Sequence, residues 1–173
     1  MLTIRAAEVE DAQAIAKVHV ATWRSAYTGI VPQPYLDSLS VRERTMAWVR
    51  ILERRGSSGI ALVSEDHDRR IVGFVAGGPL RHSDPRYQAE ISSLYVLGSH
   101  QGAGHGRRLF LAAADRLAHR GLNGLFIWVL ADNPARTFYE RLGGVAVSEV
   151  TRDFAGKALR EIGYGWSDTP NYG

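Results

Sequence analysis

A glycine-rich segment at residues 101–108 carries the clearest chemical signal in the sequence, reading Gln-Gly-Ala-Gly-His-Gly-Arg-Arg. Three glycines at alternate positions allow a sharp turn and a close approach of the backbone to a ligand. The free N–H groups at the start of a following helix would bind an anion. Arg107 and Arg108 would fall in the first helical turn, where the helix dipole disfavours each cation by about 0.3 to 1 kcal/mol. A bound phosphate would reverse that effect, so the segment predicts a phosphate site. The alternative is a glycine-rich turn with two solvated arginines.

Two other glycine motifs fit this segment poorly. A dinucleotide fingerprint needs Gly-x-Gly-x-x-Gly and an acidic residue about 20 positions later. Here the glycines are Gly102, Gly104 and Gly106, and the stretch around Asn123 supplies no carboxylate. A nucleotide phosphate loop needs Gly-Lys-Ser or Gly-Lys-Thr, which the sequence lacks.

Aromatic residues near the N-terminus are candidates for a binding site. Trp23 and Tyr27 are four residues apart and can share one face of a helix. Such a face could attract an amine by cation–π interaction, and ordinary core packing is the alternative. His19 falls on the apolar face of the same helix, and we interpret it as a core or rim histidine.

The elements that must position these residues follow from periodicity and from helix-capping residues. Ser40 can cap a helix, and the prolines and glycine at residues 29–34 separate it from the preceding helix. The two strands that follow are separated by a polar turn and lead into a third, as in an antiparallel meander. The N-terminal half thus predicts a strand, two helices and three strands at residues 2–5, 12–27, 41–54, 59–65, 71–80 and 89–96.

The C-terminal half predicts a helix after the glycine-rich segment, a buried strand, a second helix and two strands. The first helix stops at Gly121, and the strand covers residues 125–130. Asn133 would cap the second helix, with Pro134 at its first position. Two strands follow at residues 145–150 and 158–166. This order predicts a mixed α/β (α+β) layer fold with one sheet, in a single domain over residues 1–173.

Two separated segments resemble one known family. The pattern Gln101-x-x-Gly104-x-Gly106 is similar to the acyl-CoA pyrophosphate motif of the GNAT superfamily of N-acetyltransferases. Residues 131–143, Ala-Asp-Asn-Pro through Phe-Tyr-Glu-Arg-Leu-Gly, resemble the second signature of that family, and the element order matches. The resemblance implies a GNAT-like fold with one central, mostly antiparallel sheet flanked by helices. It also implies acetyl-CoA as the cosubstrate and no metal.

The resemblance further implies where CoA binds. The strand before the glycine-rich segment would pair with the pantetheine arm through main-chain groups, as in β-augmentation. Asn133 is a candidate contact, although an N-cap role competes with it. The implied cofactor-binding residues are Leu94, Tyr95, Val96, Gln101, Gly102, Ala103, Gly104, His105, Gly106, Arg107 and Asn133.

Two residues take catalytic roles by the same resemblance. Tyr139 would protonate the departing thiolate, since a phenol with a pKa near 10 stays protonated at neutral pH. The alternative for Tyr139 is a packed aromatic side chain on one helical face. Glu90 would help deprotonate the amine, directly, through water or by orienting it, and a strand-end charge or ion pair is its alternative.

Composition narrows the classes of function. The chain has 173 residues and no cysteine, which excludes a disulfide scaffold, a thiolate metal cluster and a cysteine nucleophile. Of 21 Lys and Arg residues only Lys17 and Lys157 are lysine, and the net charge is +3. Because the arginines are interleaved with acidic residues, we expect no nucleic-acid partner. The sequence contains no apolar run of membrane-spanning length, so we expect a cytoplasmic protein without a membrane partner.

We therefore expect an acetyl-CoA-dependent N-acetyltransferase that acts on a primary amine. The lack of cysteine excludes an acyl-cysteine intermediate and favours direct attack in a ternary complex. Trp23 and Tyr27 would line the acceptor site. The alternative is a non-catalytic acyl-CoA sensor or partner-binding module with the same fold. The identity of the amine stays open, a small molecule or a peptide, as does a homodimer.

Overall fold

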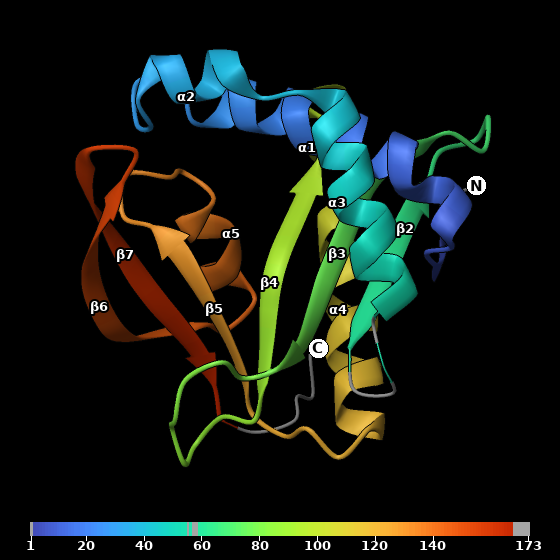
Figure 1. Cartoon of the computed structure of the whole chain (residues 1–173). Coiled ribbons are helices and arrows are strands. Elements are labelled where there is room, and N and C mark those ends of the chain that lie inside the picture. The colour runs from blue at the N-terminus through green and yellow to red at the C-terminus, as the bar shows by residue number, and fades with distance from the viewer. Residues whose placement is uncertain (1, 55, 57–58, 168–173) are drawn as a thin grey trace.

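The described residues form one seven-stranded sheet in the order β1-β2-β3-β4-β5-β7-β6. The computed structural model describes residues 2–54, 56 and 59–167. All neighbouring strands are antiparallel except β4 and β5, which are parallel. This confirms the predicted mixed, mostly antiparallel fold (Figure 1). The strands are β1 (Thr3–Ala6), β2 (Ile60–Glu65), β3 (Ile71–Pro79), β4 (Ala89–Val96), β5 (Leu125–Leu130), β6 (Val145–Phe154) and β7 (Lys157–Trp166).

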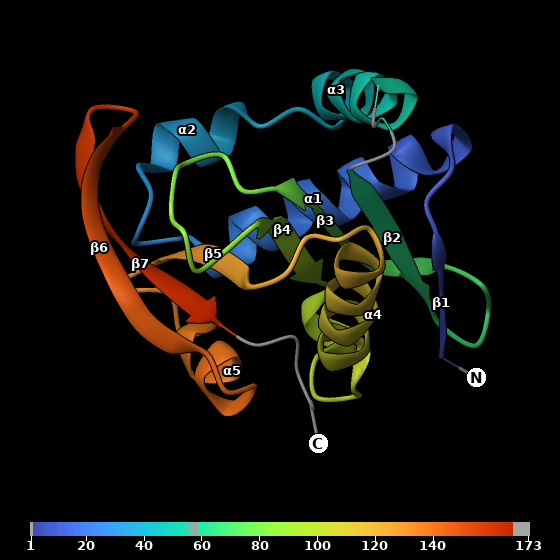
Figure 2. The same cartoon turned by 90° about the horizontal axis from the view of Figure 1, so that it is seen from below.

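Helices cover both faces of the sheet (Figure 2). The helices are α1 (Ala12–Ala26), α2 (Gln33–Ser38), α3 (Val41–Arg54), α4 (His105–His119) and α5 (Arg136–Arg141), with 3₁₀ turns η1 (Val9–Asp11) and η2 (Gly98–His100). The first three lie on one face, and α4 and α5 lie on the other. None of the described helices is both long and apolar enough to cross a membrane.

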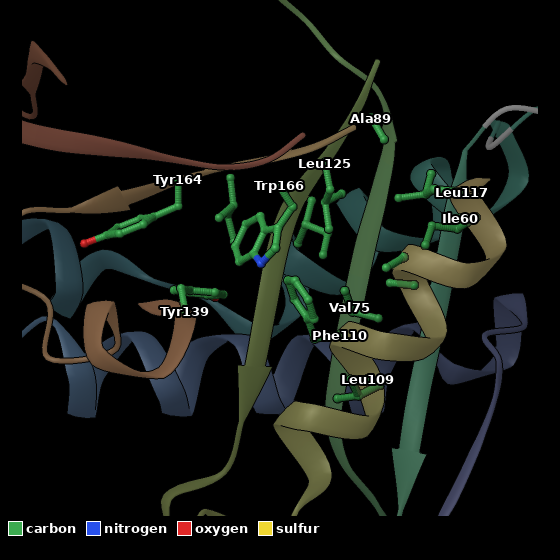
Figure 3. Close-up of a cluster of buried hydrophobic side chains, with 14 of the residues drawn as sticks. Ile60, Val75, Ala89, Leu109, Phe110, Leu117, Leu125, Tyr139, Tyr164 and Trp166 are labelled. Atoms are coloured by element: carbon green, nitrogen blue, oxygen red, sulfur yellow. The ribbon is translucent and has the colours of Figure 1, made fainter. Parts of the chain in front are cut away.

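The largest core lies between α4 and the sheet. Leu109, Phe110 and Leu117 of α4 are almost fully buried against residues of β2–β5 and β7. Figure 3 shows that Tyr139 and Trp166 extend this cluster toward α5. A second core lies beneath α1 and α3 on the other face of the sheet. Because one continuous core connects α4 and α5, the elements that carry the glycine-rich segment and Tyr139 are packed together.

A side-chain cap accounts for the predicted start of α3. The Ser40 hydroxyl accepts a hydrogen bond from Glu43 N (3.3 Å), and α3 starts at Val41 as predicted. One helix was missed, because we interpreted Pro32 and Pro34 as a break. Pro34 instead lies in the first turn of α2, where its missing N–H group costs no hydrogen bond.

The predicted start of α5 was wrong by two residues. Asn133 Oδ1 accepts a hydrogen bond from Ala135 N (2.9 Å), so Asn133 forms a local turn with Pro134 before regular helix begins at Arg136. The predicted stop was right, because Gly143 adopts a left-handed φ of 85° directly after the helix. β6 continues four residues beyond the prediction and ends at Phe154.

Candidate active site

The strands β4 and β5 separate soon after they meet. Their parallel register contains only two pairs, Ala89 with Leu125 and Glu90 with Phe126. A β-bulge lies just beyond, because Ala76 pairs with Ser93 and Gly77 with Ile91, which leaves Ser92 as the extra residue. A bulge bends and twists its strand. It accounts for the divergence of β4 from β5 visible in Figure 1.

The divergence leaves main-chain groups of β4 facing the opening. Leu97 N donates to Val72 O of β3 (2.9 Å). Since successive backbone groups of a strand point to opposite neighbours, those of Tyr95 also point to β3. The N–H and C=O groups of Leu94 and Val96 therefore point toward β5. Of the three strand residues predicted to bind CoA through the main chain, Leu94 and Val96 fit, whereas the Tyr95 backbone is directed to β3.

The glycine-rich segment begins beside the end of β4. Gln101 Nε2 donates to Val96 O (3.1 Å), which fastens the segment to the strand. Gly102 and Gly104 adopt left-handed φ angles of 78° and 88°, which favour glycine. Gly104 caps α4, and the first intrahelical bond of the helix joins Arg108 N to Gly104 O (3.1 Å). The preceding N–H groups therefore lie at an open helix start, with Arg107 and Arg108 in its first turn.

Two residues of the segment serve packing. The His105 side chain is buried, and its Nδ1 lies 2.5 Å from Ser64 Oγ of β2. Burial lowers the pKa of His105, so the ring is held neutral. A β-carbon at Gly106 would lie 3.4 Å from the ring of Phe138, so this glycine lets α5 pack closely on α4. Because the His105 side chain is buried and Gly106 has none, these two residues can bind a ligand only through their main-chain groups.

Three tyrosines converge on the opening. Tyr27 and Tyr95 lie on the α1 face, and their hydroxyl oxygens are 3.2 Å apart. Tyr139 comes from α5 on the other face and is buried against Phe110 and Trp166 (Figure 3). Electrostatic interactions link Tyr139 to both other phenols. The three phenols are therefore near enough to interact electrostatically, with Tyr27 and Tyr95 on one face of the sheet and Tyr139 on the other.

The pKa of Tyr139 is raised, chiefly by burial and secondarily by Tyr27. Among the described residues, no group hydrogen-bonds the Tyr139 hydroxyl, so neither a base nor a cation within hydrogen-bond reach stabilises its ionised form. A neutral phenol of this kind can donate a proton or a hydrogen bond to an anion placed beside it. The pKa of Tyr27 is also raised by burial, against lowering contributions from Tyr95 and Asn133. Asn133 thus lies near this cluster.

Glu90 lies at the paired end of the opening and is only 3% exposed. Its Oε1 accepts from Arg81 Nη2 (2.7 Å), and its Oε2 accepts from Arg81 Nε (3.1 Å) and Arg81 N (3.2 Å). Both carboxylate oxygens are therefore engaged by one arginine, as the ion-pair alternative predicted. Arg81 was missed by the sequence analysis, although its position just after β3, antiparallel to β4, is the signal that could have found it.

Aromatic rings line the α1 face beside the opening. The rings of Trp23 and Tyr27 are in edge contact, 4.7 Å apart. Trp23 also lies 6.0 Å from the rings of Tyr35 and Phe154. Tyr27 belongs to the buried cluster that includes Leu159 of β7, and Trp23 packs against that cluster. The predicted acceptor-site aromatics therefore lie in one wall that joins α1, α2 and the β6–β7 hairpin.

His19 is confirmed as a core residue. Trp48 Nε1 donates to His19 Nδ1 (3.3 Å), and the ring packs against Phe74 and Trp23. Burial, with a smaller contribution from Arg44, lowers the pKa of His19 to about 4. Because Nδ1 of His19 already accepts a hydrogen bond from Trp48, a structural role for His19 fits these contacts.

The chain is similar to proteins of one known family. A family model described as "Acetyltransferase (GNAT) family" matches residues 20–144 of the chain. The chain belongs to the GNAT family. The matched residues run from within α1 to just beyond α5 and include β4, the glycine-rich segment and Tyr139.

Two relatives named as N-acetyltransferases align with most of the chain. An uncharacterized N-acetyltransferase, YuaI of Bacillus subtilis, is 36% identical over 168 residues, which cover 97% of this chain and 94% of that protein. A probable N-acetyltransferase, Rv2775 of Mycobacterium tuberculosis, is 31% identical and covers 81% of this chain and 78% of its own length.

Solved structures show the same fold at lower identity. The PaiA N-acetyltransferase of Thermoplasma acidophilum, in complex with coenzyme A, has a TM-score of 0.73 and 21% identity, covering 94% of this chain and 98% of that one. YncA, a putative acetyltransferase of Salmonella typhimurium with its cofactor acetyl-CoA, has a TM-score of 0.71 and 23% identity, covering 98% and 95%. GNAT folds of this shape are thus found with CoA or acetyl-CoA bound.

Proposed function

We propose that the chain is an acetyl-CoA-dependent N-acetyltransferase that acts on a primary amine by direct transfer in a ternary complex. Family membership supports an acetyltransferase, and the donor, the acceptor and the route are our proposal. The observation that supports it best is a group of three phenols near enough to interact electrostatically, with Tyr27, and Tyr95 of β4, on one face of the sheet and Tyr139 on the other. The open start of α4 lies at the end of the same strand.

CoA fits the main-chain groups available there. The N–H and C=O groups of Leu94 and the N–H group of Val96, whose C=O already accepts from Gln101, are proposed to pair with the amide-bearing pantetheine arm. The N–H groups of the segment from Gly102 to Gly106 are proposed to bind the pyrophosphate, with Arg107 adding charge. No described atom lies within 4 Å of the space that β-carbons at Gly102 and Gly104 would take, so this surface is open to a ligand. Bound acetyl-CoA would supply the acetyl group as a thioester.

Tyr139 is proposed to supply a proton. When the amine nitrogen bonds to the acyl carbon and the carbon–sulfur bond breaks, the sulfur gains a proton and the nitrogen loses one. The raised pKa keeps the Tyr139 phenol neutral before the reaction. Because the pKa of the phenol lies above that of a thiol, near 8.5, the proton moves to sulfur only as the carbon–sulfur bond breaks, and the proton that the nitrogen loses restores the phenol. Tyr139 is therefore proposed as a general acid.

Glu90 is proposed to act through its position and charge. Because Arg81 occupies both carboxylate oxygens, Glu90 is not a free base, and it is proposed to help deprotonate the ammonium through water or to orient it. The Trp23 and Tyr27 wall is proposed to hold the rest of the acceptor by cation–π and apolar contact.

Thermal unfolding and thiol release together test this function. Acetyl-CoA at about 100 times its dissociation constant should stabilise the fold by about 2.7 kcal/mol, whereas NAD and ATP should not. CoA thiol should then be released in the presence of a primary amine. Absence of any shift with millimolar acetyl-CoA would overturn the proposal. Stabilisation without acetylated product across a broad amine panel would identify the chain as an acyl-CoA sensor instead.

A further inference from the structure

Two ion pairs lie together at the acceptor side of the opening. Arg152 Nε of β6 is 2.7 Å from Glu161 Oε2 of β7. Arg81 Nη2 is 2.7 Å from Glu90 Oε1. The Trp128 ring links the two pairs, because the Arg152 guanidinium lies 5.4 Å above it and the ring of His82, the residue after Arg81, lies 5.8 Å from it. Glu161 also acts electrostatically on Arg81. Neither Arg152 nor Glu161 has a role in the function proposed above.

The strand register directs the second pair toward the aromatic wall. Glu161 is paired with Leu130 of β5, and Arg152 with Leu159 of β7. Leu159 and Leu130 belong to or pack against the cluster that contains Tyr27. Glu161 acts electrostatically on Tyr27 as well, and the Arg152 guanidinium lies 5.4 Å above the Trp128 ring. Arg152 and Glu161 therefore border the proposed acceptor site.

The four charges are arranged by depth. The side chains of Glu90 and Glu161 are 4% and 23% exposed, whereas those of Arg81 and Arg152 are 72% and 58% exposed. The carboxylates thus lie inward and the guanidiniums outward. An ammonium group can approach the inner carboxylates, and a carboxylate attached close to it would meet the outer guanidiniums. Arg81 bonds to Glu90 through Nε and Nη2, and Arg152 pairs with Glu161 through Nε, so each guanidinium keeps further N–H donors that can bind a second carboxylate.

We propose that the acceptor is a free α-amino acid or a close analogue, recognised through its own carboxylate by Arg152 and Arg81. This inference rests on the proposed function and names its substrate class. A polyamine is disfavoured, because its second cation would meet two exposed guanidiniums. A peptide N-terminus is disfavoured as well, because the carboxylate beside the amine is replaced by a neutral peptide group.

The first experiment compares matched acceptors on the full chain with bound CoA or acetyl-CoA. The probes are the twenty standard L-amino acids, the carboxamide and decarboxylated amine of each one that binds, spermidine and a tripeptide. Calorimetry measures binding to the CoA complex, and thiol release measures turnover. An amino acid should bind about 10- to 100-fold more tightly than its carboxamide, the range expected for a charge-assisted contact. Equal binding of acid and carboxamide, or preference for spermidine or the tripeptide, would overturn the inference.

The two readouts separate this inference from the proposed function. Selective binding of an amino acid without thiol release would refute catalysis and leave the recognition proposal standing. Thiol release with amines that lack a carboxylate, at equal or higher kcat/KM, would support catalysis and refute the recognition proposal. Failure of all twenty amino acids to bind or react also refutes it.

Arg152→Gln provides the test within the chain, and Arg160→Gln is its matched control. Arg160 also pairs with a glutamate on the β6–β7 hairpin, Glu149, at 2.8 Å, and it is similarly exposed. Arg152→Gln should raise KM for the amino acid about 10- to 100-fold and change KM for its carboxamide by about twofold or less, with unchanged affinity for CoA. Equal effects on acid and carboxamide, or equal effects of the two variants, would contradict the assignment.

Discussion

At the scale of single residues, the environment of Tyr139 differs from that of its neighbour Tyr164, although both are buried tyrosines. Their rings are stacked, 6.4 Å apart. The Tyr164 hydroxyl accepts from Arg136 Nε (2.8 Å) and donates to Glu140 Oε1 (2.7 Å). The Tyr139 hydroxyl has no such partners among the described residues and lies near Tyr27 and Tyr95. The Tyr164 hydroxyl therefore has a structural role, whereas the Tyr139 hydroxyl can still hydrogen-bond to a reactant.

Tyr139→Phe should reduce kcat about 100-fold or more, as expected for loss of a general acid, with little change in the dissociation constant of CoA. Tyr164→Phe is the matched control. It should leave kcat nearly unchanged but lower the free energy of unfolding by about 1 to 2 kcal/mol, because two hydrogen bonds are lost. Steady-state kinetics and urea unfolding of both variants measure these effects. An unchanged kcat in Tyr139→Phe would remove the proposed acid role.

The family resemblance suggested Glu90 and Tyr139 but neither the Arg81 contact to Glu90 nor the Arg152–Glu161 pair. The Arg81 contact to Glu90 depends on the antiparallel pairing of β3 with β4, and the Arg152 contact to Glu161 depends on the register of β6 against β7. Both contacts join residues 9 positions apart in the sequence. Each contact can be inferred only once the two strands of its hairpin are paired, so the antiparallel pairing is the signal that could have found it.

At the scale of elements, the turn that connects β4 to α4 combines backbone conformation with ligand access. Gly104 needs its left-handed φ of 88° to start the helix, whereas Gly98 lies in the same connection with no positive φ and with open space around it. A β-carbon is therefore costly at Gly104 for conformational reasons alone. Substituting alanine at each position therefore separates the effect of backbone strain, expected only at Gly104, from the effect of an added methyl group, which is common to both.

Gly104→Ala should lower the free energy of unfolding by about 1 to 2 kcal/mol, because an L residue is strained at this φ. The displaced N–H groups should also weaken CoA binding several-fold. Gly98→Ala should change both quantities little. Urea unfolding and calorimetric titration with CoA would measure the two variants. Equal CoA affinity in Gly104→Ala and the unaltered chain would show that this turn does not shape the pyrophosphate site.

Local signals predicted most elements, and they failed where a signal had two meanings. Ser40 located the start of α3, and the apolar run at residues 125–130 located β5. Proline marks both a helix break and a first helical turn, and α2 uses the second meaning at Pro34. Asn133 can begin a helix or form a turn before one, and its bond to Ala135 N shows the second use. The bulge at Ser92, which opens the sheet, left no recognisable mark in the sequence.

At the scale of the whole molecule, the sheet consists of two parts joined by two residue pairs between β4 and β5. The part from β1 to β4 leads into the glycine-rich segment and α4. The part from β5 to β7 carries Tyr139 on α5 and the Arg152–Glu161 pair. The core under α4 spans both parts and holds them together. A cosubstrate placed in the opening would contact both parts, so its binding should change main-chain protection along the edge of β4.

Residue-resolved hydrogen exchange tests this arrangement, because the expected amide exchange rates alternate along β4. The N–H groups of Leu94 and Val96 point toward β5 beyond its paired stretch, whereas the Tyr95 N–H points to β3. In the free chain, Leu94 and Val96 should therefore exchange faster than Tyr95. Saturation with CoA should slow Leu94 and Val96 selectively, because the pantetheine amides would complete the edge. Ile162 of β7, on the far side of β5, is the internal control and should not change. Protection spread evenly over these three β4 positions, or none at Leu94 and Val96, would contradict strand-like pairing of the cosubstrate in the opening.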